Sequence, residues 1–162
     1  MKIGQFPSIA DISKDETKRY KSILPNEYYV ELNKAIGLYS HGIGIGSFVY
    51  MRRIFEKLIF DTFDEVKEEI EIDYKAFVGL KMADKIGSLS DYLPRTLVEK
   101  KALYSVLSKG IHELDENTCK ESFPIVRAGI EFILDEKITQ IQRKAKEDKF
   151  NKDFELLLNK IK

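Results

Sequence analysis

Hydrophobic residues recur every three or four positions along most of this chain, which is the period of an α-helix with one buried face. The first stripe follows Pro25 and Asn26, and the second begins about ten residues after the first ends. At about 100° per residue, the second stripe would lie more than a quarter turn from the first on one straight helix. The pattern therefore predicts either a break or kink between His41 and Gly46 or a helix that is buried on both sides. The stripes consist of Tyr28, Leu32, Ala35, Ile36 and Tyr39, and of Phe48, Met51, Phe55, Leu58, Ile59 and Val66.

Three further helices are expected after an acidic stretch. Residues 61–73 are strongly acidic and are predicted to end the second helix in a solvated segment. Residues 74–89 predict a third, shorter helix, which a turn containing Pro94 separates from a fourth helix over about 96–114. Residues 115–119 supply capping side chains for a long fifth helix. Its stripe is the clearest in the chain and contains Phe123, Val126, Ile130, Ile133, Leu134, Ile138 and Ile141.

The two ends of the chain differ from the middle. Residues 1–13 show no period and are predicted to form an N-terminal arm, after which Ser13 or Asp15 caps a short helix through about Leu24. From Lys144 the composition becomes charged and net basic. Helical spacing nevertheless continues there and predicts a last helix that docks on the body or on a partner. We thus expect an arm at 1–13, a helical bundle at 14–145 and a charged C-terminal helix at 146–162. The spacing in the last helix is carried by Phe150, Phe154, Leu157 and Ile161.

Composition supports one compact helical domain. The chain has 162 residues, 27 Lys and Arg against 27 Asp and Glu, and 43% hydrophobic residues, which suffice for a buried core. No segment alternates with period two, so an all-α fold of about five to six helices is expected. The balanced charge excludes a protein whose whole surface binds nucleic acid. RNA binding therefore stays an alternative that the net charge does not support. The acidic 61–73 and basic 144–162 stretches are opposite in charge, which favours a homodimer.

The numbers and spacing of cysteine and histidine limit the disulfides and metal sites that the chain could form. Cys119 is the single cysteine, which excludes an internal disulfide framework and a cysteine zinc site and fits a reducing cytoplasm. The two histidines show no metal-ligand spacing, so neither a metal nor another cofactor is expected. No apolar run reaches the length of a membrane span. We therefore expect a cytoplasmic protein that does not bind membranes.

A glycine-rich string occupies residues 42–46. A phosphate-binding loop needs such glycines between a strand and a helix, together with a Lys-Ser/Thr pair or a full G-x-G-x-x-G motif. Here the preceding segment is helical and neither motif is present. The preferred interpretation is a small-residue seam that lets another helix approach closely and permits a kink. That helix-packing seam contains Gly37, Ser40, Gly44 and Ser47.

Two predicted helices carry an arginine inside or beside the apolar arc with a glutamate four residues later. Arg52 precedes Glu56, and Arg127 precedes Glu131. These pairs are interpreted as a structural polar network that fixes the register of the bundle. The alternative is that the two arginines converge to hold a phosphate or carboxylate ligand, which would make the chain a sensor of small anions.

His112 is the candidate catalytic residue. It ends the predicted fourth helix, and Ser108 lies one helical turn before it, within hydrogen-bonding range. Lys101, Ser105 and Ser108 share its sector of the helical wheel beside the apolar stripe, and Lys109 is a further candidate. Nucleophilic catalysis also needs an orienting acid and an oxyanion hole, which the sequence does not show. His41 is expected to be exposed at the kink.

Three strings give the chain a resemblance to a known family. They are GLYSHGIGIGSFVYMRRIFEKLI, LYSVLSKGIHELDENTC and FPIVRAGIEFILDEKI. Together they resemble HEPN-like helical domains attached to many prokaryotic defence proteins, over about residues 26–140. In that group a long helix with an Arg-Arg-x-x-Glu-like motif packs beside a helix that ends with a Gly and a His. Arg52, Arg53, Glu56, Gly110 and His112 occupy those places here. The resemblance implies an antiparallel bundle of about five to six helices that often dimerises.

The ribonuclease members of that family have an Arg separated from a His by four to six residues. The corresponding positions before His112 are Ser105, Val106 and Leu107, and those before His41 are Lys34, Ala35 and Ile36. None of them is arginine, so the ribonuclease motif is absent at both histidines. RNA cleavage of this kind needs a cation to stabilise the phosphorane. The sequence therefore favours a non-enzymatic interaction or assembly module, and the resemblance implies a role as an accessory to a prokaryotic defence system. The alternative is an RNA-binding or degenerate ribonuclease module that uses His112 with Lys101, Lys109 or Arg95.

Overall fold

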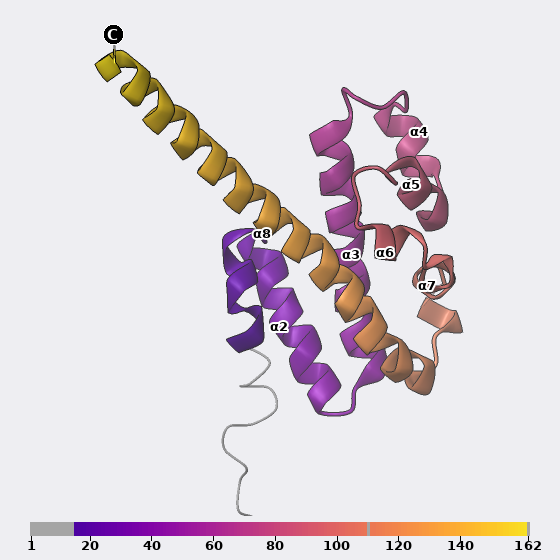
Figure 1. Cartoon of the computed structure of the whole chain (residues 1–162). Helices are drawn as coiled ribbons and strands as arrows, with labels where there is room; N and C mark the ends of the chain where they lie inside the picture. The colour runs from indigo at the N-terminus through magenta and orange to yellow at the C-terminus, as the bar shows by residue number, and fades with distance from the viewer. Residues whose placement is uncertain (1–14, 110, 162) are drawn as a thin grey trace, which may run out of the picture.

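The chain is all-helical in the part that the structure describes. A computed structural model describes residues 15–109 and 111–161, and its regular elements within those ranges are helices without any β-strand (Figure 1). The predicted all-α class is confirmed. None of the described helices is long and apolar enough to span a membrane.

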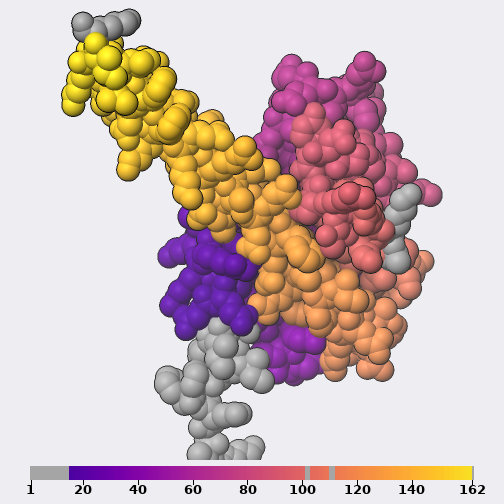
Figure 2. Space-filling model, in the orientation of Figure 1, coloured from indigo at the N-terminus to yellow at the C-terminus, as the bar shows by residue number. Residues whose placement is uncertain are grey.

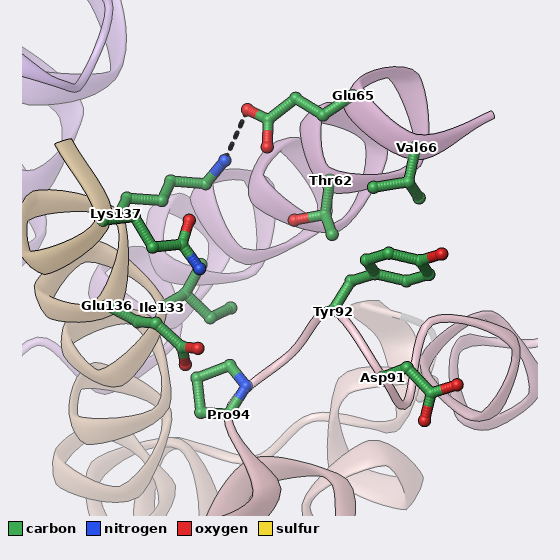
Figure 3. A pocket seen from close by; sticks show the side chains of 10 residues that line it. Thr62, Glu65, Val66, Asp91, Tyr92, Pro94, Ile133, Glu136 and Lys137 are labelled. Atoms are coloured by element: carbon green, nitrogen blue, oxygen red, sulfur yellow. Dashed lines mark hydrogen bonds and ion pairs between the residues drawn. The ribbon is translucent and has the colours of Figure 1, made fainter. Parts of the chain in front are cut away.

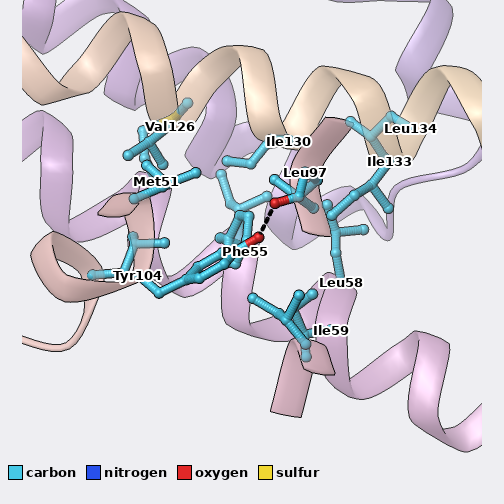
Figure 4. Packing of buried hydrophobic residues seen from close by; sticks show 14 of the residues in the cluster. Met51, Phe55, Leu58, Ile59, Leu97, Tyr104, Val126, Ile130, Ile133 and Leu134 are labelled. Carbon is cyan, nitrogen blue, oxygen red and sulfur yellow. Dashed lines mark hydrogen bonds between the residues drawn. The ribbon is translucent and has the colours of Figure 1, made fainter. Parts of the chain in front are cut away.

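Three long helices form the framework. They are α2 (Asn26–Ser40), α3 (Gly44–Val66) and α8 (Glu116–Ile161). Helix α3 packs against both α2 and α8, so its apolar stripe is the centre of the core. Figure 4 shows this packing, in which side chains of α3 and α8 meet residues from the short helices. The core there includes Met51, Phe55, Leu58 and Ile59 of α3 with Leu97, Tyr104, Val126, Ile130, Ile133 and Leu134.

The predicted break between the first two stripes is confirmed. Helix α2 ends at Ser40 and α3 starts at Gly44, so the change of phase corresponds to two separate helices. The turn between them needs glycine at Gly42, whose φ of 78° lies in the left-handed region. His41 is exposed in this turn, as expected.

Short helices replace two of the predicted longer ones. The expected helix at 74–89 is divided into α4 (Tyr74–Gly79) and α5 (Met82–Ser88), because Leu80 and Lys81 are extended. The buried side chain of Lys85 stabilises this break by donating to the carbonyls of Val78, at 3.0 Å, and Leu80. Burial of a lysine at this position had no signal in the hydrophobic pattern.

The expected helix at 96–114 is also divided. It consists of α6 (Arg95–Val98), α7 (Lys101–Leu107) and the 3-10 helix η2 (Ile111–Glu113). Lys100 interrupts the first two with a non-helical conformation. The hydroxyl of the buried Tyr104 donates to the carbonyl of Leu97 and so joins α7 to α6, while burial raises the pKa of Tyr104 to about 12. The prediction of five to six bundle helices is therefore wrong in the described ranges, which hold three long helices and several short ones.

Helix α3 includes the first residues of the acidic 61–73 stretch and ends at the last residue of its predicted stripe. It continues to Val66 because Thr62 and Phe63 are buried on its inner face. Phe63 stacks on Phe77 of α4 with ring centroids 4.1 Å apart. The acidic residues of the last turns occupy the outer side of a helix whose inner side is core.

The described N-terminal segment is attached to α8. The 3-10 helix η1 (Lys18–Ser22) lies where a short helix is predicted, and Tyr20 within it is fully buried. Its hydroxyl donates to Asp135 of α8 at 2.9 Å, and burial, with this bond, raises the pKa of Tyr20. Arg19 donates to the same carboxylate at 3.3 Å. The predicted arm at 1–13 lies outside the described residues.

Helix α8 is a single element of 46 residues that leaves the body halfway along its length. Every residue from Thr139 to Ile161 is exposed, and this half, here called the tail, projects away from the other helices (Figures 1 and 2). The segment predicted as a C-terminal helix at 146–162 does not start a new element, because residues 146–161 continue α8 without interruption.

Candidate functional site

The predicted small-residue seam lies at a close helix contact at Gly44 and Ser47 but not at Gly37 and Ser40. A Cβ on Gly44 would lie 2.5 Å from the carbonyl oxygen of Glu116, so α8 touches the backbone there. Ser47 is buried nearby. A Cβ on Gly37 would meet nothing within 4 Å, and Ser40 is exposed. The seam therefore fits the first turn of α3 to the first turn of α8 and has no ligand-binding geometry.

Glu116 caps α3 from the neighbouring helix. Its carboxylate accepts hydrogen bonds from the N–H groups of Gly44 and, at 3.1 Å, Ile45. These backbone donors hold the pKa of Glu116 below its ordinary value. The sequence predicts that Glu116 helps to cap its own helix. It caps α3 instead, through a contact between residues distant in sequence that the pattern could not predict.

Both predicted arginine-glutamate pairs form, but the arginines do not share a site. Arg52 Nε is 3.0 Å from Glu56, and its Nη1 donates to the carbonyl of Lys109 at 2.6 Å. Arg127 Nε is 2.8 Å from Glu131, and its Nη2 donates to Glu16 at 2.8 Å. Arg52 therefore links α3 to the α7–η2 connection, and Arg127 links α8 to the N-terminal segment. This arrangement does not support an anion site made by two convergent arginines.

Burial of the first pair is weaker than the apolar arc suggests. The side chains of Arg52 and Glu56 are 28% and 39% exposed. Desolvation is therefore partial, and the cost of breaking the pair is closer to that of a surface ion pair than of a buried one.

A third pair was missed by sequence reasoning. Arg53, which lies outside the apolar arc, places Nη1 2.9 Å from the carboxylate of Glu31 on α2. The Glu31 side chain is 9% exposed, and its second oxygen accepts no hydrogen bond from the described residues. The position of Glu31 three residues after Tyr28 and four before Ala35, inside the first stripe, was the available signal.

His112 does not form the predicted pair with Ser108. Helix α7 ends at Leu107 and His112 belongs to η2, so the two residues are not on consecutive turns of one helix. His112, Ser108 and Lys109 are all exposed. Arg95 is 2.7 Å from Glu99, and the side chain of Lys101 lies outside the described residues. The described geometry thus offers no enclosed catalytic constellation around this histidine.

A small polar cavity lies between α3, residues 91–94 and α8 (Figure 3). Its volume is about 140 Å³, below the range typical of ligand pockets. Its one lysine, Lys137, is 2.6 Å from Glu65, while Asp91 and Glu136 add two more carboxylates. No three His, Cys, Asp or Glu side chains among the described residues are grouped to hold a metal ion. We assign this cavity a packing role.

Two apolar features of the surface belong to α8. One is a groove of about 400 Å³ between α8 and α6–α7, here called the α8 groove. Its floor contains Ala128 and Gly129, and Ile125 and Phe132 on its border are 60% and 46% exposed. The other is the tail stripe, whose side chains are 47% to 72% exposed. The α8 groove also includes Leu97 and Leu103, and the tail stripe consists of Phe150, Phe154, Leu157 and Ile161.

No protein-family model, curated protein or solved structure matches the chain. The candidate site therefore rests on the geometry alone. Its exposed apolar side chains, Ile125, Phe132 and the tail stripe, lie along α8, whereas the candidate catalytic residues His112, Ser108 and Lys109 are exposed.

Proposed function

We propose that this protein is a non-enzymatic assembly module that functions as a homodimer through the tail of α8. The observation that carries the proposal is the tail itself, since residues 139–161 are helical and exposed yet retain an apolar stripe at helical spacing. Phe150 and Phe154 stack with ring centroids 6.0 Å apart, so the stripe forms a continuous apolar surface. Contiguous apolar patches of this kind mark interaction sites.

The cellular role is proposed from the sequence. The resemblance of residues 26–140 to HEPN-like domains supports an accessory role beside a prokaryotic defence protein in the cytoplasm. The dispersion of Arg52, Arg127 and His112 over different segments supports assembly over anion sensing or RNA cleavage.

Adjacent leucines of the tail provide a matched test. Leu156 and Leu157 have the same side chain and are 54% and 53% exposed, but they face directions about 100° apart. Leu157 belongs to the tail stripe and Leu156 does not. Multi-angle light scattering should give a dimer for the parent and for Leu156→Glu, and a monomer for Leu157→Glu. A parent that is monomeric at all accessible concentrations, or two variants that behave alike, would refute the proposal.

A deletion tests the same surface independently. Removal of residues 146–162 should convert the dimer to a monomer while circular dichroism shows the body still helical, because every described residue of this segment is exposed and none belongs to the core. A truncated chain that remains dimeric would place the interface elsewhere.

A further inference from the structure

The α8 groove and the tail stripe lie on one face of the same helix. Phe132 and Phe150 are 18 residues apart, and Ile125 and Ile161 are 36 apart. These separations correspond to about five and ten turns of α-helix, so the side chains of each pair point in the same direction. The core-facing side chains, such as Leu134, point to the opposite side. In Figure 2 the outer face of α8 crosses the front of the molecule without a covering segment.

This face is complementary to itself when a second copy runs in the opposite direction. Ile125 and Ile161 are equally distant from Arg143, which would lie at the two-fold axis. In that register Ile161 of one copy lies opposite Ile125 of the other, and Phe154 lies opposite Phe132. Each patch on one copy is then covered by a patch on the other, so no surface of this kind is left for a third copy and the assembly ends at two.

The same register places an apolar side chain of the tail at the apolar groove. Leu157 falls opposite Gly129, which lines the α8 groove. A Cβ on Gly129 would lie 3.2 Å from Leu97 and 3.5 Å from Leu103, so these two leucines cover the glycine and form an apolar wall of the groove. Leu157 of the second copy would therefore pack against side chains of α6 and α7 as well as α8.

Charge favours the antiparallel direction over the parallel one. Residues 116–140 of α8 contain three Lys and Arg against five Asp and Glu, for a net charge of −2. Residues 141–161 contain six Lys and Arg against four Asp and Glu, for a net charge of +2. Antiparallel pairing joins segments of opposite sign, whereas parallel pairing joins like to like.

The available area is sufficient for a specific dimer. Six large apolar side chains on this face, two at the groove and four in the tail stripe, are 46% to 72% exposed. At roughly 100 Å² each, two copies would cover about 1,200 Å² of apolar surface, which is at the lower limit for specific interfaces.

We propose that α8 of one copy pairs antiparallel with α8 of a second copy, with Phe154, Leu157 and Ile161 of each tail stripe seated in the other copy's α8 groove and Phe150 next to the groove, opposite Glu136. This inference rests on the proposed function and specifies the surface that receives the tail. The polar centre of the contact contains Arg143 and Glu147, which are 2.9 Å apart within one chain. A polar pair at the axis fixes the register, as polar residues do in other paired helices.

Disulfide cross-linking of the full chain tests this register. The double variant Phe132→Cys/Phe154→Cys should form a covalent dimer on mild oxidation, which reductant reverses. Both positions are exposed, and they are 22 residues apart on one helix, roughly 33 Å, so they cannot bond within one chain. The native Cys119 is buried and common to all variants, and burial raises the pKa of its thiol. The control Phe132→Cys/Leu156→Cys places one cysteine off the interacting face.

The outcomes separate this inference from the proposed function. Cross-linking of the double variant, with little for the control and for Phe154→Cys alone, supports antiparallel docking in the groove. Rapid cross-linking of Phe154→Cys alone would show that the tails pair in parallel and overturns the inference, although the chain is still a dimer. A dimer in light scattering without cross-linking in the double variant also overturns it. A parent that is monomeric in light scattering overturns both.

Discussion

Glu116 contacts Gly44 in two ways at the junction of α8 and α3. Its carboxylate accepts a hydrogen bond from the N–H of Gly44, and its main-chain carbonyl oxygen lies 2.5 Å from where a Cβ on Gly44 would be. The glycine therefore allows the approach that makes the cap possible. Helix α3 starts where it does because a side chain from a distant part of the sequence satisfies its first N–H groups.

Substitution of two glycines should have opposite effects on stability. Gly44→Ala should lower the free energy of unfolding by about 1 to 3 kcal/mol, because the new methyl group overlaps backbone atoms that must move. Gly37→Ala, inside α2 with open space around it, should raise it by about 0.5 to 1 kcal/mol. Urea denaturation of the two variants measures the difference. Equal effects would show that α8 does not approach α3 closely at Gly44.

The cap should make stability depend on pH. The pKa of Glu116 is lower in the folded chain than its ordinary 4.5, so the unfolded chain binds the proton more readily. The stabilisation is complete above the unfolded pKa and is lost as pH falls through the folded pKa. Glu116→Gln should therefore unfold at lower urea than the parent near pH 7, and the two midpoints should converge as the pH falls through the folded pKa of Glu116. Glu121→Gln, at an exposed position of the same helix, is the control. A gap that stays constant over this range would contradict charged capping.

Arg52→Ala should destabilise the fold by about 1 kcal/mol, since it removes a half-exposed ion pair and a bond to the Lys109 carbonyl. The matched control is Arg95→Ala, which breaks the same i to i+4 geometry with Glu99 where the arginine side chain is 91% exposed. We expect about 0.5 kcal/mol or less for the control. Thermal denaturation compares the two, and an equal loss would mean that the Lys109 contact contributes nothing.

The protein should not cleave RNA, and His112→Ala should leave stability within about 0.5 kcal/mol of the parent because the imidazole is exposed. Labelled single-stranded RNA incubated with each protein, together with a melt of both, measures these effects. Cleavage by the parent that the variant lacks would assign catalysis to His112. Retardation without cleavage, weakening steeply with salt, would instead indicate phosphate contacts.

Local periodicity predicted the long helices because their core faces are long and regular. Phe48, Met51 and Phe55 lie on the stripe from which they were inferred, and the break before Gly44 follows from the change of phase. The divided segments could not be inferred in this way. Lys85 stabilises the end of α4 from a buried position, and Tyr104 joins α7 to α6 through its hydroxyl. Both interactions are tertiary and leave no period in the sequence.

The candidate site shows the same division. The tail stripe was evident from the spacing of Phe150, Phe154, Leu157 and Ile161. The groove was not, because Leu97 and Leu103 belong to segments whose boundaries were predicted wrongly. The arginine pairs were identified as local pairs, but their contacts with Lys109 and Glu16 depend on how distant segments are brought together.

The continuity of α8 gives the tail its own folding behaviour. Starting an isolated helix in water is unfavourable, and most helical stability in proteins comes from tertiary packing, which the exposed residues 139–161 largely lack in a single copy. Here the docked half supplies the nucleus, and the tail only has to propagate from it. In a single copy the tail should therefore fray from Ile161 inward well before the body melts. Pairing with a second copy would make the two melt together, so the order in which the ends of one helix lose structure depends on protein concentration.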